Sequence, residues 1–176
     1  AGGVHFGMAV NPQRNALYVP ISDRPVGDLL GNSHAGTPDP SLHALDIATG
    51  KTLWRTGAPG DCTARAPGGA VTPIEDCFPG FSAAVTVTDN IVYAPTLDGV
   101  LRAFHADDGR QLWSWDTLGR HPAVNGGHAE GGAIDLGGVF VDGGQLFVSS
   151  GYGQFGQMPG NAFLVFGLDT ARETAQ

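Results

Sequence analysis

Four polar side chains stand beside glycines or at the start of apolar segments, where they could bind a ligand: His5, Ser82, Asn125 and Glu130. The oxygens of Asn125 and Glu130 are of the kind that Ca²⁺ prefers, and the glycines next to Glu130 would let an ion approach closely. Three of these side chains also have a simpler interpretation: His5 could satisfy a backbone group, Ser82 could cap a strand, and Glu130 could be an acidic loop residue in water. We expect Asp135 to be a structural hydrogen-bonding residue rather than a base.

The composition argues against several classes of protein. Nine Lys and Arg stand against 17 Asp and Glu, a formal net charge of −8, whereas nucleic-acid-binding domains normally carry a basic face. No stretch approaches the roughly 18 continuous apolar residues that indicate a membrane span. The G-x-G-x-x-G match at 151–156 is followed by Pro159 and Gly160 rather than by a helix, so it is not read as a dinucleotide-binding fingerprint. The 28 glycines and 12 prolines indicate many short strands joined by tight turns.

The chain contains an internal repeat. Leu42–Trp54 aligns without a gap with Leu101–Trp113, at an offset of 59 residues, and Phe163–Asp169 resembles the first half of a third copy. Each copy is predicted to form four short strands, because Asp-Gly and Asp-Asn turns separate apolar runs rich in β-branched and aromatic residues. In the middle copy the expected strands are 82–88, 91–96, 100–105 and 110–115, and in the third copy 132–136 is the expected first strand.

Four-stranded repeats of this length are typical of β-propeller blades, which must stack because one blade cannot bury both of its faces. The predicted fold is therefore all-β, with about three blades at 1–57, 78–118 and 128–170 and an excursion at 58–77. Propellers close with more blades than this. We expect a fragment of a longer chain, or a chain that assembles with the remaining blades or with a second chain.

The segment 44–54, A-x-D-x-x-T-G-K-x-x-W, resembles the tryptophan-docking motif of quinoprotein dehydrogenases, which are eight-bladed propellers that bind pyrroloquinoline quinone (PQQ). In that family the tryptophan packs against a glycine-containing peptide of the neighbouring blade. The resemblance implies that Trp54 and Trp113 are the docking rings and that Gly50 and Gly109 lie in the docking peptides. A flat ring suits this role where glycine lets the backbone approach closely.

Further segments are similar to the polyvinyl-alcohol dehydrogenase branch of that family: 2–9, 79–84, 124–126 and 150–155. This resemblance implies a periplasmic or secreted protein that oxidises secondary or primary alcohols with PQQ and Ca²⁺ and passes electrons to a cytochrome c. Because the chain begins with Ala1, we expect a targeting segment to have been removed or to lie outside the sequence.

The resemblance also locates a cofactor site, because the family binds PQQ and calcium with loops that enter each innermost strand at the axial mouth. Those loops are expected at 4–6, 79–82 and 125–131. The predicted cofactor-binding residues are His5, Phe81, Ser82 and Asn125. Glu130 is the predicted metal ligand, and no residue is predicted as the catalytic base.

Two loop features bear on this site. Cys62 and Cys77 are the only cysteines, and they bracket a Pro- and Gly-rich loop, which suggests a disulfide and an oxidising compartment; two free thiols are the alternative. The excursion 24–40 could line the binding face or be plain surface loop.

Two other functions fit the same repeats. A non-enzymatic PQQ-like propeller would act as a scaffold that binds protein partners in the periplasm, as in outer-membrane protein assembly. A sugar-binding propeller is supported only by acidic loops and by the aromatic residues Tyr152 and Phe155.

Overall fold

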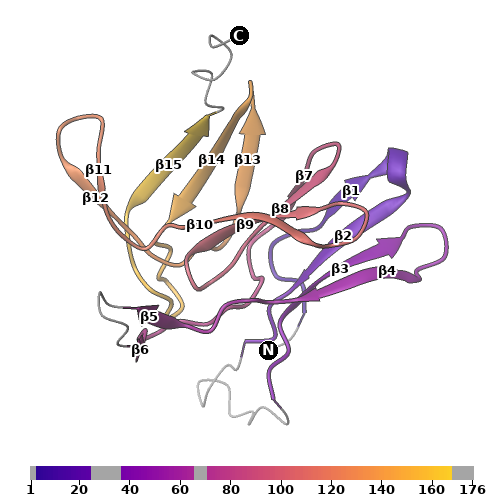
Figure 1. The fold of residues 1–176 in the computed structure, drawn as a ribbon, viewed down its shortest axis with the longest axis horizontal. Helices are drawn as coiled ribbons and strands as arrows, with labels where there is room; N and C mark the ends of the chain where they lie inside the picture. The colour runs from indigo at the N-terminus through magenta and orange to yellow at the C-terminus, as the bar shows by residue number, and fades with distance from the viewer. Residues whose placement is uncertain (1–2, 25–36, 66–70, 168–176) are drawn as a thin grey trace.

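A computed structural model of the chain describes residues 3–24, 37–65 and 71–167, and almost every element in it is a β-strand. Three antiparallel sheets lie side by side in chain order, splayed like neighbouring blades (Figure 1). Blade 1 comprises β1 (Ala9–Asn11), β2 (Ala16–Ile21), β3 (Ser41–Asp46) and β4 (Thr52–Gly57), with a 3₁₀ turn η1 (Pro12–Arg14) between its first two strands. Blade 2 comprises β7 (Thr86–Val87), β8 (Ile91–Pro95), β9 (Val100–His105) and β10 (Gln111–Asp116). Blade 3 comprises β13 (Val139–Asp142), β14 (Gln145–Ser150) and β15 (Ala162–Gly167).

Two short hairpins accompany the blades. The ribbon of β5 (Thr63–Arg65) and β6 (Val71–Pro73) lies in the excursion between blades 1 and 2. The ribbon of β11 (Gly119–Pro122) and β12 (His128–Gly131) lies between blades 2 and 3 and projects away from all three sheets (Figure 1). The predicted all-β propeller architecture is therefore confirmed.

The first strands begin later than the sequence pattern predicts. In blade 2 only Thr86–Val87 pairs as the innermost strand, and in blade 3 the segment 132–136 is not a strand, since β13 begins at Val139. The cause is a contact between blades: the Ala84 N–H donates to the Leu136 carbonyl at 2.8 Å. These inner segments hydrogen-bond to the neighbouring blade instead of extending the ladder of their own sheet.

Trp54 joins blade 1 to blade 2 as the resemblance predicted. Its indole Nε1 donates to the Ala106 carbonyl at 2.9 Å, and its ring lies so close to Gly109 that a Cβ there would sit 2.5 Å from Cε3. Gly109 has a φ of +69°, which glycine adopts without strain. The Tyr18 hydroxyl donates to the same carbonyl at 3.2 Å. Burial raises the pKa of this phenol, so it stays protonated and able to donate.

Two apolar clusters bury the faces between blades. Between blades 1 and 2 the cluster includes Leu42, Val92 and Phe104, each with no exposed surface. Between blades 2 and 3 it includes Leu101 and Val148.

The outer faces of the end blades remain uncovered. Phe140 and Phe163 on blade 3 are 65% and 66% exposed, and Val10 and Leu53 on blade 1 are 52% and 53% exposed. Gly50, the predicted docking glycine of blade 1, has open space where a Cβ would point.

Candidate cofactor mouth

The connections from β2 to β3, β4 to β7, β8 to β9, β10 to β13 and β14 to β15 lie at one end of the antiparallel sheets. Hydrogen bonds tie these segments to one another: Ser22 N–H donates to Gly3 O, and Gly151 N–H donates to Ala133 O at 2.8 Å. We call this end the mouth and define it by residues 3–6, 22–24, 78–85, 96–99, 132–136 and 151–160. Because every blade contributes to it, side chains distant in sequence meet there.

His5 and Ser82 form a pair at the mouth. The Nδ1 of His5 lies 3.0 Å from the Ser82 hydroxyl, and the bond links the segment entering blade 1 with the segment entering blade 2. His5 is exposed, whereas Ser82 is buried. Because the bond engages Nδ1, Nε2 is the ring nitrogen from which His5 can reach a ligand. The structure thus brings together two residues that the resemblance had placed at the same mouth, and their roles toward a cofactor stay predictions.

Phe81 supports this pair from within the core. It has no exposed surface and packs edge-on against Phe104, with ring centroids 6.0 Å apart. Its side chain therefore fixes the main chain that carries Ser82, and a direct contact between Phe81 and a cofactor stays a prediction.

Asn125 and Glu130 lie on the β11–β12 hairpin, and the main chain of Glu130 exchanges two hydrogen bonds with Asn161, each 2.7 Å long. Asn125 is exposed in the hairpin turn, and its Oδ1 accepts from Gly127 N–H at 3.0 Å. Glu130 pairs in register with Arg120, and their side chains are 3.9 Å apart and solvent-exposed. The expected loop at 125–131 is a hairpin because Asn-Gly at 125–126 is a strong turn signal, with Gly126 at a φ of +81°. Their roles toward cofactor and metal stay predictions.

Asp135 is a buried carboxylate at the mouth. It is 5% exposed, and its Oδ2 accepts from the Gln157 side-chain amide at 2.8 Å. Its Oδ1 has no hydrogen-bond partner within the described part of the chain, and neither has the buried hydroxyl of Ser22. Buried polar atoms without partners are uncommon in native proteins and indicate an additional ligand or water. Both of these atoms belong to mouth segments.

Arg24 adds a cation that the sequence analysis did not single out. Its guanidinium donates to the carbonyls of Phe155 at 3.2 Å and Gly156 at 2.8 Å, so a residue of blade 1 reaches the loop of blade 3. The signal available in the sequence was its place at the start of the excursion 24–40. Residues 25–36 of that excursion lie outside the described residues.

The described residues hold no group of three or more His, Cys, Asp or Glu side chains that could bind a metal ion. Ca²⁺ takes six to eight oxygen ligands. The oxygen ligands of the described mouth, such as the Asp135 carboxylate, can supply only part of a calcium site. The hydrogen-bond donors His5, Ser82 and Arg24 are of the kind that bind carboxylates, and the roles of His5 and Ser82 toward PQQ stay predictions.

A hollow of about 370 Å³ lies away from the mouth, between blades 2 and 3, and is lined by Tyr93, Trp113 and Phe166 among others. Trp113 is 37% exposed and packs edge-on against Phe166. The stretch of the third copy on which Trp113 would dock lies beyond residue 167, outside the described residues.

The confirmed disulfide joins Cys62 to Cys77 and closes the loop between blades 1 and 2. Ile74, Cys77 and Phe78 of this loop pack against a small core made by Leu97, Ala133 and Met158. The disulfide loop therefore covers the mouth edge between blades 2 and 3.

Two four-stranded blades joined by a docked tryptophan, with a third blade of three described strands stacked beside them, form part of a β-propeller of the quinoprotein type. The chain belongs to the PQQ_2 family, described as outer membrane protein assembly factor BamB, whose model matches residues 31–131.

Two relatives with longer matches are polyvinylalcohol dehydrogenases, as the sequence resemblance indicated. The chain is 34% identical to a polyvinylalcohol dehydrogenase of Pseudomonas over 96% of the chain and 25% of the relative. It is 30% identical to a polyvinylalcohol dehydrogenase of Sphingopyxis over 86% of the chain and 21% of the relative.

Among solved structures, quinohemoprotein alcohol dehydrogenase from Comamonas testosteroni matches with a TM-score of 0.56 at 19% identity, over 93% of the chain and 26% of that protein. This likeness supports the fold. The chain thus spans about a quarter of the length of the relatives that it matches. In the described residues no helix is long and apolar enough to cross a membrane.

Proposed function

We propose that the intact protein oxidises alcohols with PQQ, and that this chain supplies part of the cofactor mouth. The observation that carries the proposal is the His5–Ser82 pair, which lies at the mouth of blades that resemble polyvinylalcohol dehydrogenases. The substrate is an alcohol, either polyvinyl-alcohol-like or another secondary or primary alcohol.

When bound with Ca²⁺, PQQ supplies a quinone that accepts hydride from the alcohol carbon. The chain's own residues hold and orient it. The His5 imidazole donates a hydrogen bond from Nε2 to a carboxylate while its Nδ1 accepts from the Ser82 hydroxyl, and Arg24 of blade 1 contributes positive charge beside the blade 3 loop. The Asp135–Gln157 bond fixes the loop with which Arg24 is in contact.

The calcium site is proposed to be shared with parts of the protein other than the described residues. Glu130, the predicted metal ligand, and Asn125 stay candidates: the main chain of Glu130 is bonded to Asn161 at the edge of the mouth, whereas Asn125 lies in the turn of the β11–β12 hairpin. The uncovered faces of blades 1 and 3 are proposed to stack against further blades or a second chain, since large apolar faces are rarely left in water. A cytochrome c is the proposed electron acceptor.

A periplasmic or secreted location fits the disulfide between Cys62 and Cys77. Disulfides persist in oxidising compartments and are rare in the cytosol.

A scaffold function is the second candidate, because the matching family model is described as outer membrane protein assembly factor BamB. In that case protein partners would bind the propeller and no quinone would be needed.

Quinone binding separates the two candidates. We expect the intact apoprotein to bind PQQ with Ca²⁺ in calorimetric titrations, and His5→Ala and Ser82→Ala to weaken binding by about tenfold or more. A hydrogen bond to a charged group contributes roughly 1.5–3 kcal/mol, which corresponds to this change. His105→Ala, on the outer turn between β9 and β10, is the matched control and should leave affinity unchanged. An intact protein that binds no PQQ would support the scaffold.

A further inference from the structure

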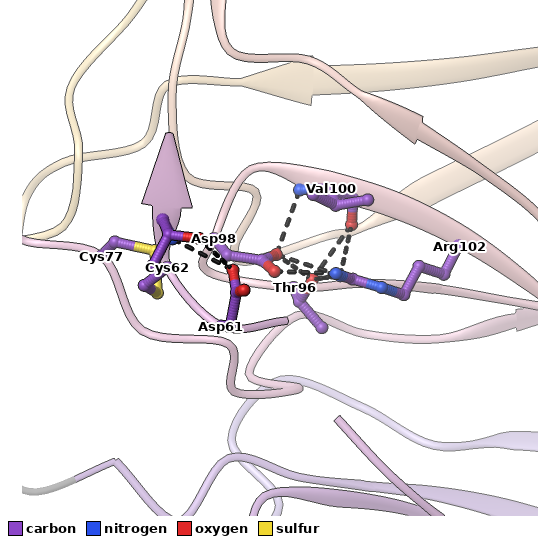
Figure 2. Close-up of a disulfide and its surroundings, with 8 residues drawn as sticks. Asp61, Cys62, Cys77, Thr96, Asp98, Val100 and Arg102 are labelled. Atoms are coloured by element: carbon purple, nitrogen blue, oxygen red, sulfur yellow. Dashed lines mark hydrogen bonds and ion pairs between the residues drawn. A yellow bond between two sulfur atoms is a disulfide. The ribbon is translucent and has the colours of Figure 1, made fainter. Parts of the chain in front are cut away.

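The turn between β8 and β9 contains a buried ion pair. The Arg102 guanidinium forms a bidentate ion pair with the Asp98 carboxylate, with Nη2 donating to Oδ2 at 2.8 Å and Nη1 donating to Oδ1 at 3.0 Å (Figure 2). Both side chains are 5% exposed. The Thr96 hydroxyl accepts from Arg102 and donates to Asp98. Burying two charges costs desolvation energy that their attraction often only balances, so such a pair is weak evidence of a stabilising role. Its geometry is a better guide to what it does.

The main chain of this turn is bonded to both inner segments of the mouth. Leu97 N–H donates to Gly80 O at 3.0 Å, two residues before the serine of the mouth pair. Ile134 N–H donates to Thr96 O at 3.4 Å, one residue before the buried Asp135. A shift of the turn would therefore move both segments.

The segment that leads into the disulfide loop lies against the ion pair. The main chain of Gly60 lies directly against the carboxylate, since a Cβ at Gly60 would sit 2.1 Å from Asp98 Oδ2. Two residues further on, Cys62 is tied to Cys77, and Figure 2 shows this disulfide beside the ion pair. A charge pair kept dry attracts much more strongly than one in water.

We propose that Asp98 and Arg102 are positioning residues of the mouth. Their ion pair fixes the 96–100 turn, and the turn sets the placement of the Ser82 and Asp135 segments relative to each other. The part of this inference that concerns cofactor affinity rests on the proposed function, whereas the part that concerns placement does not.

The test uses the intact protein and four variants, one of which is the conservative Arg102→Lys. Arg102→Met leaves a buried carboxylate unpaired, so the double variant Asp98→Leu/Arg102→Met is added, because it removes both charges. Arg110→Met is the matched control, since the Arg110–Asp108 pair is solvent-exposed. Amide hydrogen exchange is measured residue by residue, together with PQQ affinity.

In both Arg102 variants we expect the amides of Leu97, Ala84 and Ile134 to exchange at least tenfold faster, while the amides of β2 and β3 keep their rates. PQQ affinity should fall about tenfold in the same variants, and the control should change neither quantity. Arg102→Lys, which keeps the charge but loses the fork geometry, should restore only part of the protection.

Unchanged exchange at these three amides in the folded double variant would overturn the proposal, and so would an equal acceleration in all blades. If the wild type binds no PQQ and the local acceleration is still seen, the positioning role stands and the proposed function fails.

Discussion

Replacing Trp54 with alanine is expected to lower the free energy of unfolding by about 4 kcal/mol, a value typical of large buried aromatic residues. The Trp54 ring is 9% exposed, packs on Gly109 and donates its N–H to the Ala106 carbonyl. Its removal therefore leaves a cavity between blades 1 and 2 and an unpaired carbonyl. Urea unfolding of the intact protein, followed by circular dichroism, measures the change.

Two companion variants separate the docking contact from general effects. Trp115→Ala removes an indole ring that is 48% exposed, so it should lower the free energy of unfolding by clearly less than Trp54→Ala does. Tyr18→Phe removes only one hydrogen bond to the Ala106 carbonyl, which corresponds to about 1 kcal/mol. Equal losses for Trp54→Ala and Trp115→Ala would contradict the docking role.

Removing the disulfide is the second change with a large expected effect. Cys62→Ser/Cys77→Ser should destabilise the protein by about 3 kcal/mol, the chain-entropy value for a loop with this sequence separation of 15. The loop packs over Leu97 and Met158, so local opening should begin there. Thermal melting with and without a thiol reductant measures the effect.

Reductant should lower the melting temperature of the wild type to that of the double serine variant and leave the variant itself unchanged. A wild type that melts at the same temperature in both conditions would refute this expectation.

The blade pattern was readable from the sequence because it depends on local features. The offset of 59 residues aligned the two outer strands of blades 1 and 2, and Asp98-Gly99 formed the expected turn, with Gly99 at a φ of +77°. The docking of Trp54 on Gly109 could also be predicted, because the resemblance to the quinoprotein docking motif implied it.

The rest of the mouth depends on contacts between distant residues. Arg24 and Gly156 are 132 positions apart, and no local pattern couples them. The Asp135–Gln157 bond arises only once the β14–β15 loop folds back onto blade 3. The β11–β12 hairpin, in which Glu130 pairs with Arg120, was not predicted because its turn signal was interpreted as a loop.

The central claim is that this chain belongs to a PQQ-dependent alcohol dehydrogenase. The most direct test adds PQQ and Ca²⁺ to the intact apoprotein and follows reduction of an artificial electron-accepting dye with a panel of alcohols that includes secondary diols. We predict alcohol-dependent reduction that requires both additions. Absence of reduction with every alcohol, in a folded protein that also fails to bind PQQ, would contradict the claim and favour a scaffold.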